Sequence, residues 1–187
     1  MSPESYYIVK EGVVLVELLN SSSKVTQIIY LLTNMQGFGY EATDIAFVKK
    51  RALTDVTLYQ IDREFMLDHF YVQPKFFHKM TDLISSLNEN LMVITNMLNQ
   101  KPEQKVRMAL CIIIQLLSLD QDGNTFEMPS FITQSFIASF CRTKVTTVSE
   151  TYKLLEKEQL IKITSRKVTI LDYEELQNDM NSKALKV

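Results

Sequence analysis

The sequence predicts an α+β protein with an N-terminal antiparallel β-barrel of incomplete jelly-roll type, a long dimerisation helix and a C-terminal winged helix-turn-helix. Three observations predict this fold. Short β-rich runs come first, apolar residues then repeat with a heptad period from Phe77 to Leu98, and Phe131–Asp172 has the pattern of two short helices followed by two β-runs. We expect domains at residues 1–73, 74–100 and 101–187.

The first domain is predicted from β-rich runs that turn residues separate. Tyr6–Leu19 is interrupted at Glu11-Gly12, which predicts a hairpin. Asn34–Glu41 holds two of the four glycines and is expected to be a loop. The other expected elements are strands at Lys24–Leu32, Ile45–Val48 and Val56–Ile61, and a short helix at Asp62–Phe70.

The long helix is expected to begin at Pro74, because proline suits the first turn of a helix. Its apolar residues recur in alternating steps of 3 and 4, as in a coiled-coil seam. Two interpretations stay open: the stripe packs against the chain's own β domain, or it forms a parallel two-helix dimer. The constant heptad period favours the dimer. The seam residues are Phe77, Met80, Ile84, Leu87, Leu91, Ile94 and Leu98.

The last domain is predicted to open with a largely buried helix, Glu103–Leu119, because this helix is apolar on most faces. A turn at Asp120–Asn124 and a short strand at Phe126–Met128 follow. Thr133 and Thr143 are the expected N-caps of the two short helices. The expected apolar interior of the motif is Ile137, Ala138, Phe140, Val148, Leu154 and Leu155.

The second of these short helices carries small polar residues on its expected exposed face. Val145, Thr146, Ser149 and Glu150 lie near its N-terminus, where base contacts are usually made. Valine can meet a thymine methyl, threonine can bond several base edges, and glutamate can accept from cytosine N4. For each residue the alternative is an ordinary solvated helix face, and Glu150 is also compatible with a repulsive or structural role.

Composition supports a nucleic-acid partner only when the charge is divided by region. The net charge is −2, but Ser130–Ile170 carries seven cations and three anions, which leaves +4 there and −6 elsewhere. No apolar run is long enough to span a membrane, and Cys111 and Cys141 are expected to be buried thiols of a cytoplasmic protein. His69 and His78 lack ligand or catalytic spacing, so we expect neither an enzyme nor a metal or cofactor site.

The chain resembles the Crp/Fnr family of bacterial transcription regulators along nearly its whole length. The C-terminal likeness rests on Ile132-Thr133, Ile137-Ala138, Thr147-Val148, Leu155-Glu156, Leu160-Ile161 and Val168–Asp172, and the N-terminal likeness on Tyr6–Val14 and Arg51–Val56. The resemblance implies a homodimer on double-stranded DNA, with RNA polymerase as a partner. It implies phosphate contacts from Thr133, Ser135, Thr147, Arg166 and Lys167, and base contacts from Val145, Thr146, Ser149 and Glu150.

Several positions depart from the family pattern. Arg142 stands where the turn usually has glycine, so a slightly remodelled turn is expected, and Glu150 replaces the usual base-reading arginine. Asp44 lies where an arginine would hold the phosphate of a cyclic nucleotide, so no cyclic-AMP binding is expected. The family's iron–sulfur cysteines are missing. Few residues precede Tyr6, which predicts either a reduced barrel or a truncated chain.

A sequence-specific DNA-binding regulator that acts as a homodimer on near-palindromic sites is therefore the leading hypothesis. The main rival is a protein-interaction module whose winged helix no longer binds DNA, and Glu150 and Arg142 motivate it. A third hypothesis is a sensor that still binds a nucleotide. An effector pocket at Tyr30, Tyr40 and Tyr59 is conceivable, although an aromatic barrel core is the expected role of these residues.

Overall fold

The computed structural model describes residues 5–19, 26–39, 47–119, 124–164 and 167–184. The chain divides into two compact units, residues 1–93 and 94–187, so the boundary falls inside the long helix. Each unit is considered by itself. Among the described residues no helix is long and apolar enough to cross a membrane.

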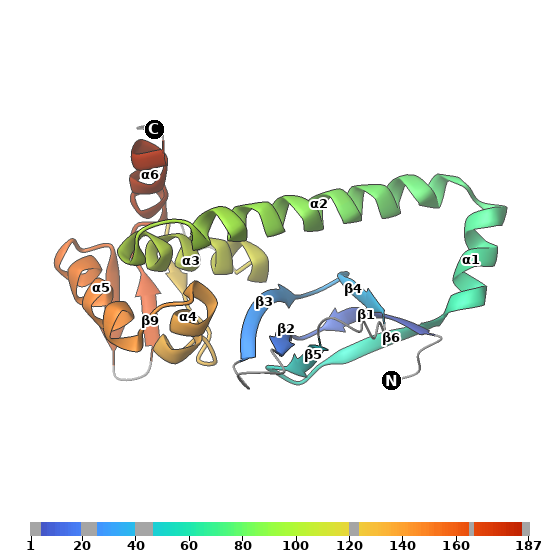
Figure 1. The fold of residues 1–187 in the computed structure, drawn as a ribbon, viewed down its shortest axis with the longest axis horizontal. Coiled ribbons are helices and arrows are strands. Elements are labelled where there is room, and N and C mark those ends of the chain that lie inside the picture. The colour runs from blue at the N-terminus through green and yellow to red at the C-terminus, as the bar shows by residue number, and fades with distance from the viewer. Residues whose placement is uncertain (1–4, 20–25, 40–46, 120–123, 165–166, 185–187) are drawn as a thin grey trace. The chain divides into compact units, whose positions relative to one another are not determined.

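The first unit contains two antiparallel sheets, each of three strands within the described residues (Figure 1). In one sheet, β1 (Ser5–Glu11) lies between β4 (Gly37–Gly39) and β6 (Thr57–Asp62). In the other, β2 (Val14–Leu19) lies between β3 (Thr26–Leu32) and β5 (Phe47–Ala52). Side chains alternate between the core and the surface, as in β1, where Tyr7 and Val9 are buried.

The predicted hairpin at Tyr6–Leu19 is wrong, because β1 and β2 belong to different sheets. Gly12 has φ +92°, and a Cβ there would lie 2.2 Å from the carbonyl oxygen of Asp55. The Val13 N–H donates to Thr54 Oγ1 at 2.9 Å. The turn is therefore held by a distant loop, and it carries the chain from one sheet into the other.

The predicted loop at Asn34–Glu41 is also wrong in part, since β4 lies inside it and pairs with β1. A three-residue strand with glycine at both ends has little β-propensity, so contacts with other strands stabilise it: it pairs with β1, and Lys50 Nζ of β5 donates to the Gly39 carbonyl oxygen at 2.6 Å. The core of this unit includes one charged side chain, Glu17, whose Oε1 accepts from Arg51 Nη2 at 3.0 Å.

Two helices follow the sheets. Asp62 caps α1 (Arg63–Val72) by accepting from the Phe65 N–H at 3.0 Å, and α1 has no buried residue. The long helix α2 (Lys75–Leu98) begins next to Pro74, as predicted. Its contact with the β-strands includes Asn90, whose Nδ2 donates to the hydroxyl of Tyr30 at 3.0 Å.

The second unit is a small α/β domain built around α3 (Pro102–Leu117), which has proline at its start and ten buried residues. Packed with it are α4 (Gln134–Cys141), α5 (Val145–Lys157) and α6 (Tyr173–Ala184). The strands β7 (Phe126–Glu127), β8 (Ile161–Thr164) and β9 (Lys167–Ile170) form a sheet of order β7-β9-β8. The predicted buried helix and short strand are therefore confirmed, and the turn at Asp120–Asn124 lies mostly outside the described residues.

Both cysteines lie in the core of the second unit, as predicted. Burial raises the pKa of the Cys111 and Cys141 thiols to about 12, so both are protonated at neutral pH. The aromatic core predicted for the first unit is wrong at Tyr59, which is 49% exposed on β6, whereas Tyr30 is buried. Tyr40 lies outside the described residues.

Candidate nucleic-acid interface

Two short helices and a left-handed turn form the centre of the candidate interface. Thr133 caps α4, since its hydroxyl oxygen accepts from the Phe136 N–H at 3.1 Å. The helix ends at Arg142, which keeps a left-handed conformation with φ 52° and ψ 51°. Arginine therefore adopts here a conformation that usually favours glycine, and the expected remodelling of the turn stays a prediction.

The predicted N-cap of α5 is wrong by one residue. The Thr143 N–H donates to the Ala138 carbonyl at 2.9 Å, so Thr143 still closes α4. The chain becomes extended only at Lys144, which occupies the N-cap position without a side-chain cap. The first N–H groups of α5 therefore have no capping side chain, and the helix begins beside an exposed ammonium group.

The faces of α5 are clearly separated. Its buried residues, Val148, Thr151, Tyr152 and Leu155, hold it against the rest of the domain. Leu154 is 36% exposed, so its predicted place in the apolar interior is wrong: it lies at the edge of the buried stripe. The side chains with predicted base contacts are exposed or half-buried, namely Val145, Thr146, Ser149 and Glu150.

A buried arginine fixes the far end of α5. The Arg107 side chain on α3 is 5% exposed, and its Nη2 donates to Glu158 Oε2 at 2.8 Å and to Glu103 Oε1 at 3.1 Å. Glu158 is the C-cap residue of α5. The contact therefore joins the C-terminal end of α5 to α3. Sequence reasoning did not find it, because Glu158 lies 51 residues beyond Arg107.

The wing consists of β8 and β9 and is attached to α5. Glu156 Oε1 on α5 accepts from the Ile163 N–H of β8 at 3.1 Å. Lys167 forms an ion pair with Glu127 of β7, so its charge is partly balanced within the chain. Arg166, the other predicted phosphate contact of the wing, lies outside the described residues.

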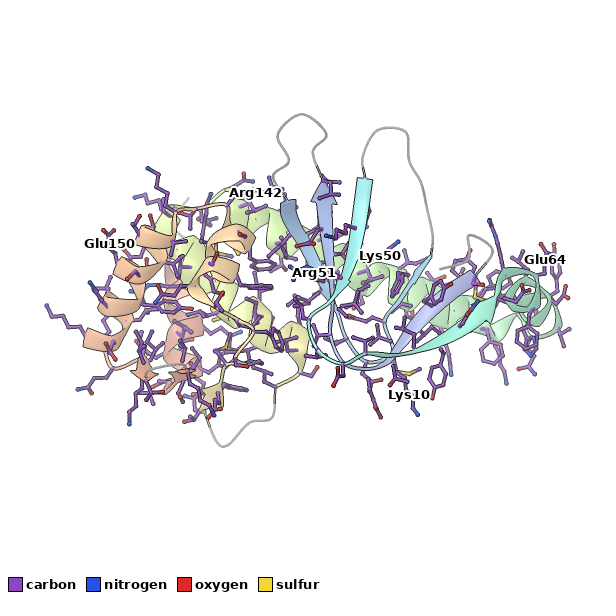
Figure 2. The ribbon with its side chains drawn as sticks, turned by 90° about the horizontal axis from the view of Figure 1, so that it is seen from below. Lys10, Lys50, Arg51, Glu64, Arg142 and Glu150 are labelled. Atoms are coloured by element: carbon purple, nitrogen blue, oxygen red, sulfur yellow. The ribbon has the colours of Figure 1, made fainter. Side chains whose placement is uncertain are left out.

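The remaining predicted phosphate contacts lie around the motif. Thr133 and Ser135 are exposed at the start of α4, and Thr147 is half-buried in the first turn of α5. Two exposed cations that the prediction did not include, Arg142 and Lys144, lie at the turn, and Figure 2 shows Arg142 and Glu150 on different parts of this surface. The position of both cations beside a helix start was visible in the sequence.

The α2 seam, defined by the seven predicted dimerisation residues, is covered in part by the chain itself. Phe77, Ile84 and Leu91 are 47%, 56% and 40% exposed. Met80, Leu87 and Leu98 are half-buried, and Ile94 is buried in its own chain. Asn90, which donates to the Tyr30 hydroxyl, lies at the edge of the seam, so the face of α2 that meets its own strands borders the seam.

Comparison with known proteins identifies the second unit. Residues 108–178 match the family model described as the Crp-like helix-turn-helix domain. This segment is similar to Crp-like helix-turn-helix domains. It includes α4, α5 and both strands of the wing. No curated protein matches the chain at a significant level.

Solved structures extend the likeness to the whole chain. A cyclic nucleotide-binding domain containing protein from Listeria monocytogenes has a TM-score of 0.79 and 22% identity, over 94% of this chain and 83% of that one. FixK2 from Bradyrhizobium japonicum has a TM-score of 0.77 and 16% identity, over 95% of this chain and 88% of that one. A CRP-family transcriptional regulator from Thermus thermophilus has a TM-score of 0.72 and 18% identity, over 97% of this chain and 90% of that one.

These comparisons confirm the predicted fold and the resemblance to Crp/Fnr regulators. The chain has the fold of these regulators: an N-terminal unit of antiparallel strands, a long helix, and a C-terminal segment similar to the Crp-like helix-turn-helix domain. Its described residues contain no group of three or more histidine, cysteine, aspartate or glutamate side chains placed to hold a metal ion. Asp44 and Glu41, at the predicted nucleotide position, lie outside the described part of the chain.

Proposed function

We propose that this protein is a homodimeric, sequence-specific DNA-binding regulator of transcription that places α5 in the major groove of near-palindromic sites. The observation that carries the proposal is the exposed face of α5. It holds short polar side chains, it starts without a capping side chain, and exposed cations lie beside its start. A helix with such a face suits the major groove, because short side chains reach base edges while the cations meet phosphates.

Roles for the individual residues follow from their exposure. Val145, Thr146, Ser149 and Glu150 face bases in this proposal. Thr133, Ser135 and Thr147 bind phosphates, and Thr133 can do so while it caps α4, because its hydroxyl hydrogen remains available to a phosphate oxygen. Arg142 and Lys144 join this set. Arg166 and Lys167 approach the backbone from the wing.

The homodimer rests on the α2 seam. Three of its apolar residues are two-fifths or more exposed, and apolar rows of this kind on a helix usually mark a contact with a partner. A parallel pairing of two α2 helices gives two copies of α5 related by a two-fold axis. Their half-sites would then lie about 34 Å apart, one turn of DNA, which requires a near-palindrome.

DNA binding is tested by titrating the full chain against a labelled random-sequence duplex at several salt concentrations. A DNA-binding protein should weaken steeply as salt rises, because phosphate contacts release counterions. Lys144→Gln should reduce the slope of log K against log salt by about one for each half-site occupied. Lys75→Gln, at the exposed start of α2, is the matched control and should leave the slope unchanged.

The seam is tested by mass measurement in solution. Ile84→Glu places a charge on the seam and should shift the protein to monomer, because a buried unpaired carboxylate is costly. Ser85→Glu adds the same charge to the adjacent, exposed residue off the seam and should leave the dimer intact. A wild-type protein that is monomeric at micromolar concentration would contradict the dimer proposal.

A protein-interaction module is the second candidate function. Two observations favour it: Glu150 is an exposed anion on the face that would meet DNA, and the ammonium group of Lys167 is already paired with Glu127. The same salt titration separates the candidates. Failure to bind any duplex at low salt would support the interaction module.

The partners that family resemblance implies are also proposals. We propose RNA polymerase as the protein partner, the cytoplasm as the location, and no response to cyclic AMP. Calorimetry with cyclic AMP and cyclic GMP tests the last point, and measurable heat from a saturable site would contradict it.

A further inference from the structure

Glu150 lies at the centre of the DNA-facing side of α5. A helix turns about 100° per residue, so Thr146, Glu150 and Lys153 share one line along it. The residues on the opposite side, including Val148, are buried. Glu150 is exposed, and Figure 2 shows it on the outer side of α5. A helix that enters the major groove with this side therefore brings the Glu150 carboxylate to a base edge.

The Glu150 carboxylate does not hold the described part of the domain together. It makes no ion pair and no side-chain hydrogen bond with any residue that the structure describes, although Lys153 lies one turn away. Two other glutamates of the domain do make such contacts: Glu156 accepts a hydrogen bond from the Ile163 N–H of the wing, and Glu158 forms an ion pair with Arg107. The carboxylate is consequently available to a ligand, and its side chain can change without loss of a contact inside the domain.

An ionised carboxylate only accepts hydrogen bonds, which restricts the bases it can meet. Guanine presents two acceptors in the major groove, and thymine presents an acceptor and a methyl group, so neither offers a donor. Adenine offers its N6 amino group, but the N7 acceptor beside it repels the carboxylate. Cytosine offers its N4 amino group with no acceptor beside it on the same base. Cytosine is therefore the base that best satisfies Glu150.

The same charge works against binding in general. A carboxylate near DNA is repelled by phosphates, and this repulsion is offset only where a base donates to it. The exposed cations Arg142, Lys144 and Lys153 supply attraction that does not depend on sequence. Together they give a surface on which cations bring the helix to the duplex and the carboxylate selects among sites.

We propose that Glu150 is the residue that selects cytosine at one base pair of each half-site, an inference that rests on the DNA-binding function proposed above. Duplexes are selected from a random pool by the full-length wild-type chain and by two variants, and the bound pool is sequenced. Wild type should prefer cytosine over guanine at that position by about tenfold. Glu150→Gln should change the preference to adenine, and Glu150→Arg to guanine, since these side chains match those bases.

Glu174→Gln is the matched control, because it removes an equal charge from an exposed position on α6. It should select the same bases as wild type, and circular dichroism should show that all variants are folded. If wild type and Glu150→Gln both bind DNA and select the same base at every position, the inference fails while the proposed function stands. It fails too if Glu174→Gln changes the base preference. If wild type binds no duplex at low salt, the proposed function fails and the inference fails with it.

Discussion

Replacing Glu158 should destabilise the second unit more than replacing its partner Arg107. The Arg107 side chain is 5% exposed, whereas those of Glu158 and Glu103 are 40% and 48% exposed. Glu158→Ala leaves a buried guanidinium with one carboxylate fewer. Arg107→Met keeps an apolar chain in the core and leaves two carboxylates that water can solvate. The order of the two effects therefore follows from which partner is buried.

The size of the Glu158 effect lies between two limits. Breaking a fully buried ion pair costs about 3–5 kcal/mol, and an exposed pair contributes about 0–1 kcal/mol. Solvent screens Glu158, and Glu103 still contacts the guanidinium, with Nη2 to Oε1 at 3.1 Å. We therefore expect Glu158→Ala to cost about 1–2 kcal/mol, and Arg107→Met to cost less than about 1 kcal/mol.

The assay is urea unfolding of the full chain followed by circular dichroism, for wild type, both single variants and the double variant. The four free energies form a double-mutant cycle, and the expected coupling energy is about 1 kcal/mol. Glu174→Ala, an exposed carboxylate of α6, serves as a control and should change stability little. A larger loss from Arg107→Met than from Glu158→Ala would refute the reasoning, as would a coupling energy within experimental error of zero.

Three further predictions concern particular backbone and thiol positions. Gly12→Ala should destabilise the β unit by more than about 2 kcal/mol in urea, because the new Cβ would lie 2.2 Å from the Asp55 carbonyl oxygen; an unchanged midpoint would contradict this. Arg142→Gly should increase the free energy of unfolding by up to about 1 kcal/mol, because glycine adopts the left-handed conformation without strain. The melting temperature should therefore rise, and a lower melting temperature would show that the turn is not strained. The thiols of Cys111 and Cys141, with pKa about 12 when folded, ionise near pH 9 once unfolded, so the unfolded state loses protons first and stability should fall between pH 9 and 12. Replacing both cysteines with alanine should flatten that fall, measured by urea unfolding at each pH.

The helices α2 and α3 could be predicted well because each carries its own periodic signal, whereas α6 was not predicted. The heptad residues and Pro74 locate α2, and the apolar run with Pro102 at its start locates α3. The cap of α4 at Thr133 was also visible, since a threonine before an apolar periodic segment is a local signal. Local signals of this kind do not depend on what the rest of the chain does.

Sheet partners could not be predicted in the same way. Glu11-Gly12 between two β-runs has the local pattern of a hairpin, yet the chain passes there from one sheet to another. What decides between these outcomes is the contact of this turn with Thr54, which lies 41 residues beyond Val13. The glycine-bounded strand β4 depends in the same way on a partner in β1. Neither contact leaves a signal in the neighbouring sequence.

The sequence predicted which residues of the candidate interface are exposed, but it did not predict the contacts that hold α5 in place. Alternation of polar and apolar residues in α5 is enough to assign Val145 and Thr146 to the surface. Lys144 took the N-cap position because Thr143 is still bonded to α4, a detail that depends on how the preceding helix ends. The Arg107–Glu158 pair was invisible because an arginine in an apolar helix does not show which distant carboxylate will neutralise it.

The division of α2 between the two units links its seam to the DNA-binding domain. Residues up to Val93 belong to the first unit, and Ile94 and Met97 are buried as part of the second. The end of α2 is followed at once by α3, which Arg107 fastens to the end of α5. In the proposed homodimer, a substitution that loosens the seam, such as Ile84→Glu, should therefore weaken DNA binding without touching α5, because two linked domains bind a near-palindrome more tightly than one domain.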